Sequence, residues 1–443
     1  MKKKALWSRL IYVIAVVGTL ALLLSVNSTT PYMALLPYLF LPIGLFLPEL
    51  LIPLFFIASL SSDYFIAGEG VGFTRILALV IIAGAMSRLI LKRKKLQRRW
   101  LANFILIMVV SLISFLLSYD KNIIFLLVMG LNILVFIAIA NLPLSSDQVV
   151  QLFRAILVAV LVTTLYYSVT FILNPDFLEN GRLTIAEGLN ENRYGMMMAQ
   201  MSAFCLVYIY FTKKNFVKSI CLLAGMINVY FVLLSGSRSA LLGIALGFIF
   251  TVLIASYVQK KIKKRFFGMA LICAIAMFVF YIVIELNPML AYRMNIDQLV
   301  ATGGTRRWPR IVAEIQYLIP THFFFGVGQG AMNEKIALSQ YMTDPGSSHN
   351  FIVSALSQLG IVGFIAYMSF YWRIIKDTVS KVGEMQILII PLMLILTAFF
   401  NGVGEVIYTE RLFWNALALA GLCLVTNNKS NTMKNHGLLK GKQ

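Results

Sequence analysis

The sequence predicts an all-α, polytopic integral membrane protein with about 12–14 transmembrane helices and one long outer loop. Composition is the first reason: of 443 residues, 60% are hydrophobic and only 13% are charged, and the mean hydropathy is +0.84. A soluble domain of this size does not need so much apolar surface, whereas runs of roughly 20 apolar residues each cross a bilayer. The apolar runs are continuous rather than alternating, which excludes an outer-membrane barrel.

Hydropathy then divides the chain into candidate spans. They lie near residues 6–26, 32–47, 49–66, 72–91, 101–118, 122–141, 150–173, 194–212, 217–235, 239–257, 266–285, 349–372, 386–403 and 411–426. The first run resembles a signal peptide, but no small-x-small cleavage site follows it, and we expect a retained helix. We expect the Pro-rich stretch 31–53 to form a short hairpin, because the basic runs on either side of it should both be cytoplasmic.

Basic clusters set the predicted orientation. The clusters at 2–4, 92–99, 213–214, 260–265 and 429–442 all fall on one side, and the positive-inside rule makes that side the cytoplasm. Residues 1–443 are thus predicted to form a single domain of the plasma (inner) membrane with both termini cytoplasmic and the loop 286–348 outside. The net charge of +20 reflects these cytoplasmic basic clusters, which also match anionic lipid headgroups. It does not indicate nucleic-acid binding.

The outer side differs from the inner side in the type of its basic residues. Lysines dominate inside, whereas arginines dominate outside. Orientation needs only charge, but gripping a phosphate in fixed geometry favours the planar guanidinium fork. The outer arginines are therefore candidates for a phosphate site, the alternative being that they cap helices and pair with outer acids. They include Arg193, Arg238, Arg306, Arg307, Arg310 and Arg411.

Three segments are expected to converge on the outer face. In the first, a Gly/Ser turn at 235–237 places Arg238 at the start of a helix, where exposed backbone N–H groups favour an anion. The second, 303–310, contains Thr305-Arg306-Arg307-Trp308. An amphipathic helix follows it, with Ile311, Val312, Ile315 and Leu318 at helical spacing, and is expected to lie along the membrane surface. The third is Ser347-Ser348-His349-Asn350, opening the next span.

His349 is the candidate catalytic base. Its neutral imidazole at a helix mouth can accept a proton from a hydroxyl, the alternative being a helix cap or hydrogen-bonding residue. His322 is interpreted as structural and His436 as inert. The four cysteines fall inside apolar runs with no metal or pairing spacing, so we expect buried thiols and no metal site.

These segments together resemble the O-antigen ligase/polymerase family (the Wzy/WaaL, or Wzy_C, superfamily). The resemblance is strongest over residues 188–363 and rests on short motifs in the family's order. They are Gly188–Arg193, Ser237-Arg238-Ser239, Arg306 ahead of Phe325-Gly326-Val327-Gly328, and His349-Asn350 leading into Gln358-Leu359-Gly360-Ile361-Val362-Gly363.

The resemblance implies glycosyl transfer without metal or cofactor on the outer face of the plasma membrane, from undecaprenyl-pyrophosphate-linked glycan to the hydroxyl of an acceptor glycan or lipid. Residues matching Arg238 and Arg306 would hold the pyrophosphate and His349 would activate the acceptor. The family often places a Trp about four residues after the loop arginine, whereas Trp308 follows Arg306 by two, so Arg307 competes for that role. Secondary substrate contacts would come from Asn192, Arg193, Arg310 and Asn350.

A polymerase is favoured over a ligase that moves finished glycan to lipid A core, because no lipid A acceptor site is identified. A protein O-oligosaccharyltransferase is a further variant. A polysaccharide or lipid-linked glycan transporter would want ionisable residues near the midplane of several spans, and most spans here have none. A non-enzymatic scaffold leaves the arginine asymmetry unexplained.

Overall fold

The computed structural model describes most of the chain as α-helix. The described residues are 2–26, 35–60, 72–91, 96–174, 178–179, 182–183, 190–258, 281, 285, 291, 295 and 307–435. Among them, six helices are long and apolar enough to cross a membrane, and six shorter apolar helices accompany them. The protein is an all-α polytopic membrane protein, as predicted. Arg306, His436 and most of the predicted span 266–285 lie outside the described residues.

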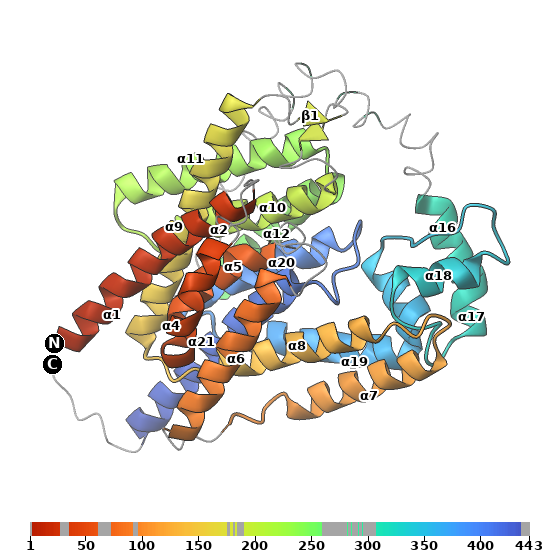
Figure 1. Cartoon of the computed structure of the whole chain (residues 1–443), viewed down its shortest axis with the longest axis horizontal. Helices are drawn as coiled ribbons and strands as arrows, with labels where there is room; N and C mark the ends of the chain where they lie inside the picture. Colours follow the sequence, from red (N-terminus) through yellow and green to blue (C-terminus); the bar gives the residue numbers. More distant parts are fainter. Residues whose placement is uncertain are drawn as a thin grey trace.

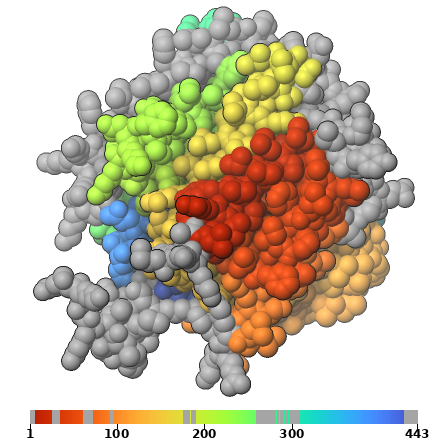
Figure 2. All heavy atoms as spheres, turned by 60° about the vertical axis from the view of Figure 1, so that its left-hand side comes forward, coloured from red at the N-terminus to blue at the C-terminus, as the bar shows by residue number. Residues whose placement is uncertain are grey.

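The N-terminal part is a set of apolar helices that pack on one another. Its elements are α1 (Lys2–Val13), η1 (Ile14–Gly18), α2 (Thr19–Val26), η2 (Leu36–Phe40), α4 (Leu41–Phe46), η3 (Pro48–Leu51), α5 (Ile52–Leu60), α6 (Phe73–Leu91), α7 (Leu101–Leu117) and α8 (Ile123–Ala140). The break in the Pro-rich stretch falls at Leu47, whose backbone leaves the helical region just before Pro48. Pro42 sits in the first turn of α4, where no hydrogen-bonding N–H is needed. Figure 2 shows these helices, red to orange, side by side on one face of the molecule, next to the yellow and green segments.

The rest of the chain supplies the central helices and a group on one side of the bundle. These elements are α9 (Ser146–Leu173), the antiparallel pair β1 (Leu178–Glu179) and β2 (Arg182–Leu183), α10 (Glu191–Tyr208), α11 (Asn215–Ser235), α12 (Arg238–Val258), α16 (Arg307–Ala313), η5 (Glu314–Leu318), α17 (Ile319–Thr321), α18 (Ala331–Leu338), α19 (Phe351–Lys381), η6 (Gln386–Leu388), α20 (Ile389–Asn401) and α21 (Arg411–Asn435). A capping box between Ser145 and Gln148 makes α9 begin four residues before the predicted start.

Helices α12 and α20 cross at glycines. A Cβ on Gly243 would lie 2.7 Å from the Thr397 carbonyl oxygen, and one on Gly247 would lie 2.5 Å from Thr397 Oγ1. Only glycine permits this approach, which follows the small-xxx-small rule for helices in membranes. The crossing holds the N-terminal end of α12, which starts at Arg238, next to the loop that follows α20.

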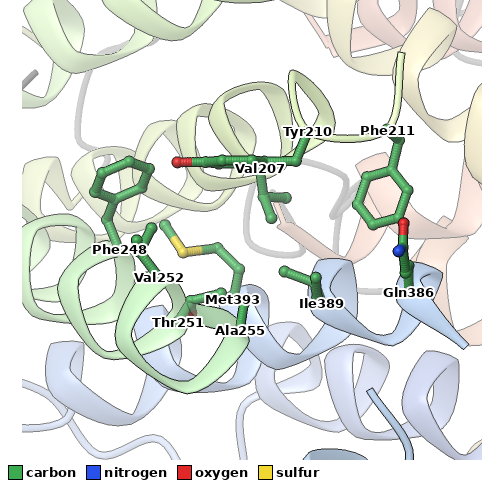
Figure 3. Close-up of a pocket in the computed structure, with 10 residues that line it drawn as sticks. All are labelled: Val207, Tyr210, Phe211, Phe248, Thr251, Val252, Ala255, Gln386, Ile389 and Met393. Carbon is green, nitrogen blue, oxygen red and sulfur yellow. The ribbon is translucent and has the colours of Figure 1, made fainter. Parts of the chain in front are cut away.

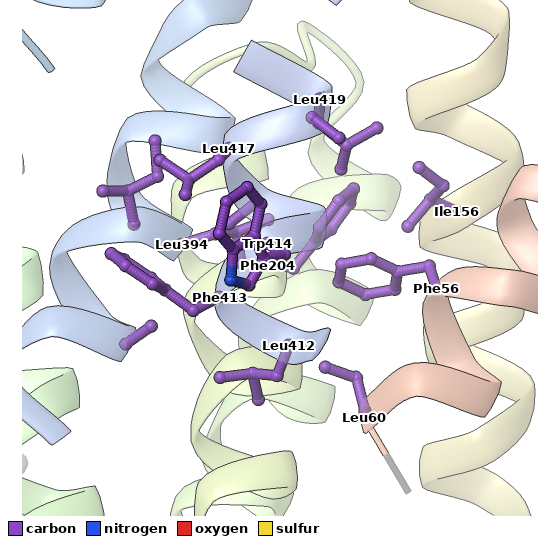
Figure 4. Packing of buried hydrophobic residues seen from close by; sticks show 14 of the residues in the cluster. Phe56, Leu60, Ile156, Phe204, Leu394, Leu412, Phe413, Trp414, Leu417 and Leu419 are labelled. Carbon is purple, nitrogen blue, oxygen red and sulfur yellow. The ribbon is translucent and has the colours of Figure 1, made fainter. Parts of the chain in front are cut away.

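The core next to this crossing is aromatic. Figure 4 shows Trp414 and Phe413 of α21 close to Phe204 of α10 and Phe56 of α5. The Trp414 indole N–H donates to the Tyr408 carbonyl oxygen at 2.8 Å, so the one polar atom of this large buried side chain is satisfied. This contact also ties the loop between α20 and α21 to the core.

Helix α19 is broken at Gly360, whose φ of 65° and ψ of −175° are not helical. The break leaves two carbonyl groups of the first half of the helix free to accept from the segment after α17. Val327 N–H donates to the Ser357 carbonyl oxygen at 2.8 Å, and Gly328 N–H donates to that of Gln358 at 3.1 Å. The chain around the break is thus attached to the group formed by α16, α17 and α18, which lies on the side of the bundle away from α1 (Figure 1).

A helix forms after Arg307, as predicted, and continues into the π-helical turn η5. Of the four apolar residues at helical spacing, Leu318 is buried, Ile311 and Val312 are partly buried, and Ile315 is half exposed. Glu314 beside them is fully buried. That this helix lies along the membrane surface stays a prediction.

Candidate functional site

The turn that carries His349 is held on both sides. Among the described residues, His349 is the only non-glycine residue with positive φ, at 52°. Asn350 caps α19: its side-chain oxygen accepts from the N–H groups of Ile352 and Val353 at 3.1 Å, and its side-chain amide donates to the Val403 carbonyl at 3.2 Å. Phe351 N–H donates to the Gly402 carbonyl at 2.8 Å. The His349 turn is therefore attached to the loop after α20.

That loop presents an acid to the imidazole. His349 Nδ1 lies 3.5 Å from Glu405 Oε2, with His349 40% exposed and Glu405 11% exposed. A carboxylate facing Nδ1 favours the tautomer with the proton on Nδ1, which leaves Nε2 as the acceptor. The half-exposed ring can thus take a proton from a group that approaches from outside.

The same carboxylate meets Arg307. The Nη2 atom of Arg307 lies 3.7 Å from Glu405 Oε1, and its Nη1 donates to the Gly404 carbonyl oxygen at 2.7 Å. Glu405 therefore joins the first residue of α16 to the candidate base. Glu405 is not among the residues predicted from the sequence; the available signal was an acid in a short Gly-containing turn between two apolar spans.

The start of α12 adjoins this group. A Cβ on Gly404 would lie 2.6 Å from Ser239 Cβ, so the first turn of α12, which opens with Arg238, packs against the Glu405 loop. The start of α10 packs on the preceding turn, where a Cβ on Gly195 would lie 2.6 Å from both Ser235 Oγ and Ser237 Cβ. The N-terminus of α12, which is favourable for an anion, therefore lies beside the Glu405 loop, and the start of α10 lies behind the turn that precedes α12.

Two of the predicted secondary residues are bound to acids in the structure. Arg193 Nη2 lies 3.3 Å from Glu410 Oε1, and Arg310 Nη2 donates to Asp344 Oδ2 at 3.1 Å. These two ion pairs agree with the alternative given for the arginines above, namely that they pair with acids of the protein. Asn192 lies in the first turn of α10, where its N–H donates to Asn190 Oδ1 at 2.9 Å.

A separate apolar pocket lies between α10, α12 and α20 (Figure 3). Its lining includes Val207, Thr251 and Met393. Thr251 is about 20 Å along α12 from Arg238 at the usual rise of 1.5 Å per residue. The pocket is therefore not part of the His349 group.

Across the part of the chain that the structure describes, no group of three or more His, Cys, Asp or Glu side chains is placed to hold a metal ion. Cys205, Cys221 and Cys423 are buried free thiols, as expected, and Cys273 lies outside the described residues.

His322 contacts Tyr119, whose hydroxyl lies 3.3 Å from Nε2 of the ring.

Residues 221–368 match the family model described as O-antigen ligase (Wzy_C). The matched segment, about a third of the chain, includes Arg238, Arg307 and His349. No curated protein and no solved structure matches the chain. The family implies a membrane enzyme that ligates or polymerises glycans. Residues 221–368 are therefore similar to the O-antigen ligase (Wzy_C) family, the family that the motifs of the chain resemble.

Proposed function

We propose that the protein transfers glycan from an undecaprenyl-pyrophosphate donor to an acceptor hydroxyl on the outer face of the plasma membrane, acting as a polysaccharide polymerase. The observation that carries the proposal is the meeting of His349 and Arg307 at Glu405, beside the helix start that opens with Arg238. This reaction requires a base for the acceptor hydroxyl, and it requires guanidinium groups and a helix N-terminus near the leaving diphosphate.

The acceptor hydroxyl oxygen attacks the anomeric carbon of the donor, and the bond from that carbon to the pyrophosphate oxygen breaks. The hydroxyl proton passes to His349 Nε2. The negative charge that develops on the leaving diphosphate is stabilised by guanidinium groups and by the N-terminal N–H groups of α12. Glu405 stabilises the imidazolium that forms, as a carboxylate partner does for a catalytic histidine.

The contacts of Arg307 bear on the choice between the two neighbouring arginines. Its guanidinium is already engaged by Gly404 and Glu405, so its role in this proposal is to hold the Glu405 loop and to contact the diphosphate second. This supports Arg306, together with Arg238, as the principal pyrophosphate ligand. Asn192, Arg193, Arg310 and Asn350 remain proposed secondary substrate contacts.

The test is a gel of lipid-linked glycan from a strain that lacks this protein, compared with strains that express the wild type or Arg238→Ala at equal levels. Accumulation of single lipid-linked repeats, restored to polymer by the wild type only, supports the polymerase. Full-length chains that stay on the carrier lipid would instead identify a ligase. Normal polymer on its final acceptor without the protein would reject both.

A further inference from the structure

Two acids are buried beneath the His349 turn. Glu314 of η5 and Glu334 of α18 have no exposed surface, and the Ser357 hydroxyl of α19 lies between them, 3.1 Å from Glu314 Oε2 and 2.9 Å from Glu334 Oε1. Neither acid has an ion pair among the described residues. Such burial is costly for a carboxyl group, because the charged form loses its solvation.

Glu314 binds the residue immediately before His349. Ser348 N–H donates to Glu314 Oε1 at 2.8 Å, and the Ser348 hydroxyl donates to Oε2 at 3.1 Å. One carboxyl group thus holds both the main chain and the side chain of Ser348. Ser354 supports the arrangement, since its hydroxyl lies 3.2 Å from that of Ser348.

The His349 backbone needs such support. A left-handed conformation is unfavourable for a residue with a side chain and persists only when the surroundings enforce it. Asn350 enforces it from the C-terminal side by capping α19, and the Glu314–Ser348 pair enforces it from the N-terminal side. Glu314 opens the π-helical turn η5, a feature frequent at functional sites, and its carboxyl group is buried where it meets Ser348.

We propose that Glu314 is a positioning residue: by binding Ser348 it locks the His349 turn, so that the imidazole faces Glu405 on one side and the acceptor on the other. This inference rests on the proposed role of His349 as base. A buried acid that does not touch the substrate would then affect the rate of proton transfer rather than donor binding.

The experiment uses the full-length protein in liposomes with an undecaprenyl-pyrophosphate-linked repeat as donor and acceptor, comparing wild type, Glu314→Ala and Glu314→Gln. Glu314→Ala is expected to lower kcat by roughly 100-fold, the cost of a small displacement of a catalytic group. The donor KM should stay at the wild-type value, because the arginines are untouched. Glu314→Gln should recover most of the rate, because its amide oxygen still accepts from Ser348 N–H.

Ser348→Ala provides a second, smaller perturbation that removes one of the two bonds, and its kcat should fall between those of wild type and Glu314→Ala. The matched control is Ser339→Ala, the same change at the end of α18, where the hydroxyl donates only to the local Ile336 carbonyl at 2.7 Å. Thermal unfolding of every variant reports whether it folds. Where Glu314→Ala does not fold, Ser348→Ala and Glu314→Gln decide.

Wild-type kcat in folded Glu314→Ala, with His349→Ala inactive, overturns the positioning role and leaves the proposed function standing. A loss that appears equally in kcat and KM, follows the loss of thermal stability and is not rescued by glutamine would show a merely structural role. Full activity of His349→Ala defeats the proposed function itself, whatever Glu314 does.

Discussion

Nδ1 of His349 lies 3.5 Å from Oε2 of Glu405. The other oxygen of this carboxylate lies 3.7 Å from Nη2 of Arg307, so a single acid connects the candidate base to the start of α16. A candidate proton acceptor and a cation thus both contact one small loop, Gly402–Glu405, which leaves the end of α20.

The Glu405 carboxylate is expected to orient the imidazole and to stabilise its charged form. Glu405→Gln should lower kcat by one to two orders of magnitude, since a hydrogen bond to a charged group contributes about 1.5–3 kcal/mol. Initial transfer rates in liposomes check this, with Glu384→Gln, an acid in the turn after α19, as the matched control. Unchanged kcat in Glu405→Gln would remove this acid from the mechanism.

The two loop arginines should differ in what their replacement by lysine does. Arg306→Lys is expected to abolish transfer, because an ammonium group cannot grip the diphosphate with a planar fork. Arg307→Lys should retain part of the rate, because one ammonium can still reach the Gly404 carbonyl. Transfer rates at several donor concentrations separate the two variants. Near-normal activity of Arg306→Lys would show that charge alone suffices at that position.

The buried acids should make stability depend on pH. Burial and the nearby Glu334 carboxylate raise the pKa of Glu314 to about 8, and burial also raises the pKa of Glu334. The protonated forms are thus favoured by folding, and this contribution, complete below the ordinary carboxyl pKa of 4.5, is lost as pH rises towards 8. The groups around Glu314 are Glu334, Ser348, Ser357 and the Tyr408 phenol.

Melting temperatures of wild type and Glu314→Gln between pH 5 and pH 9 test this. The wild-type melting temperature should fall more steeply with rising pH, because the glutamine carries no titrating proton. Parallel curves would mean that Glu314 does not titrate in this range.

The break in α19 requires glycine. A Cβ on Gly360 would lie 2.3 Å from the Phe324 carbonyl carbon, and its φ of 65° is unfavourable for any side chain. Gly360→Ala should therefore destabilise the protein by more than about 1–3 kcal/mol. Gly130→Ala is the control, because a Cβ there meets only Met108 Cε at 3.8 Å inside a regular helix. Melting temperatures in detergent check both, and an unchanged value for Gly360→Ala would show that the break is not needed.

The sequence predicted the helical class well because long apolar runs have few alternatives in a membrane. It also predicted that the Arg238 turn, Arg307 and His349 would lie in one region, and the structure places the elements that carry them side by side. Arginine enrichment did not predict which arginines are already paired: Arg193 and Arg310 contact acids distant in sequence, and no local pattern encodes such a partner.

Glu314 and Glu405 could not be singled out from the sequence for different reasons. Glu314 is an acid in a stretch that was expected to be amphipathic, and no local pattern predicts that its carboxyl group is fully buried and bound to Ser348. Glu405 acquires its partners through the packing of its loop against the His349 turn and the start of α16, segments that are distant from it in the chain. Both are consequences of tertiary geometry rather than of local pattern.

The most direct test of the account is the rate of glycan transfer by purified His349→Ala in liposomes that contain an undecaprenyl-pyrophosphate-linked donor. The account predicts folded protein with wild-type donor KM and a kcat lower by roughly 100-fold to 10,000-fold, the usual contribution of a general base. A folded His349→Ala variant that transfers glycan at the wild-type rate would contradict it.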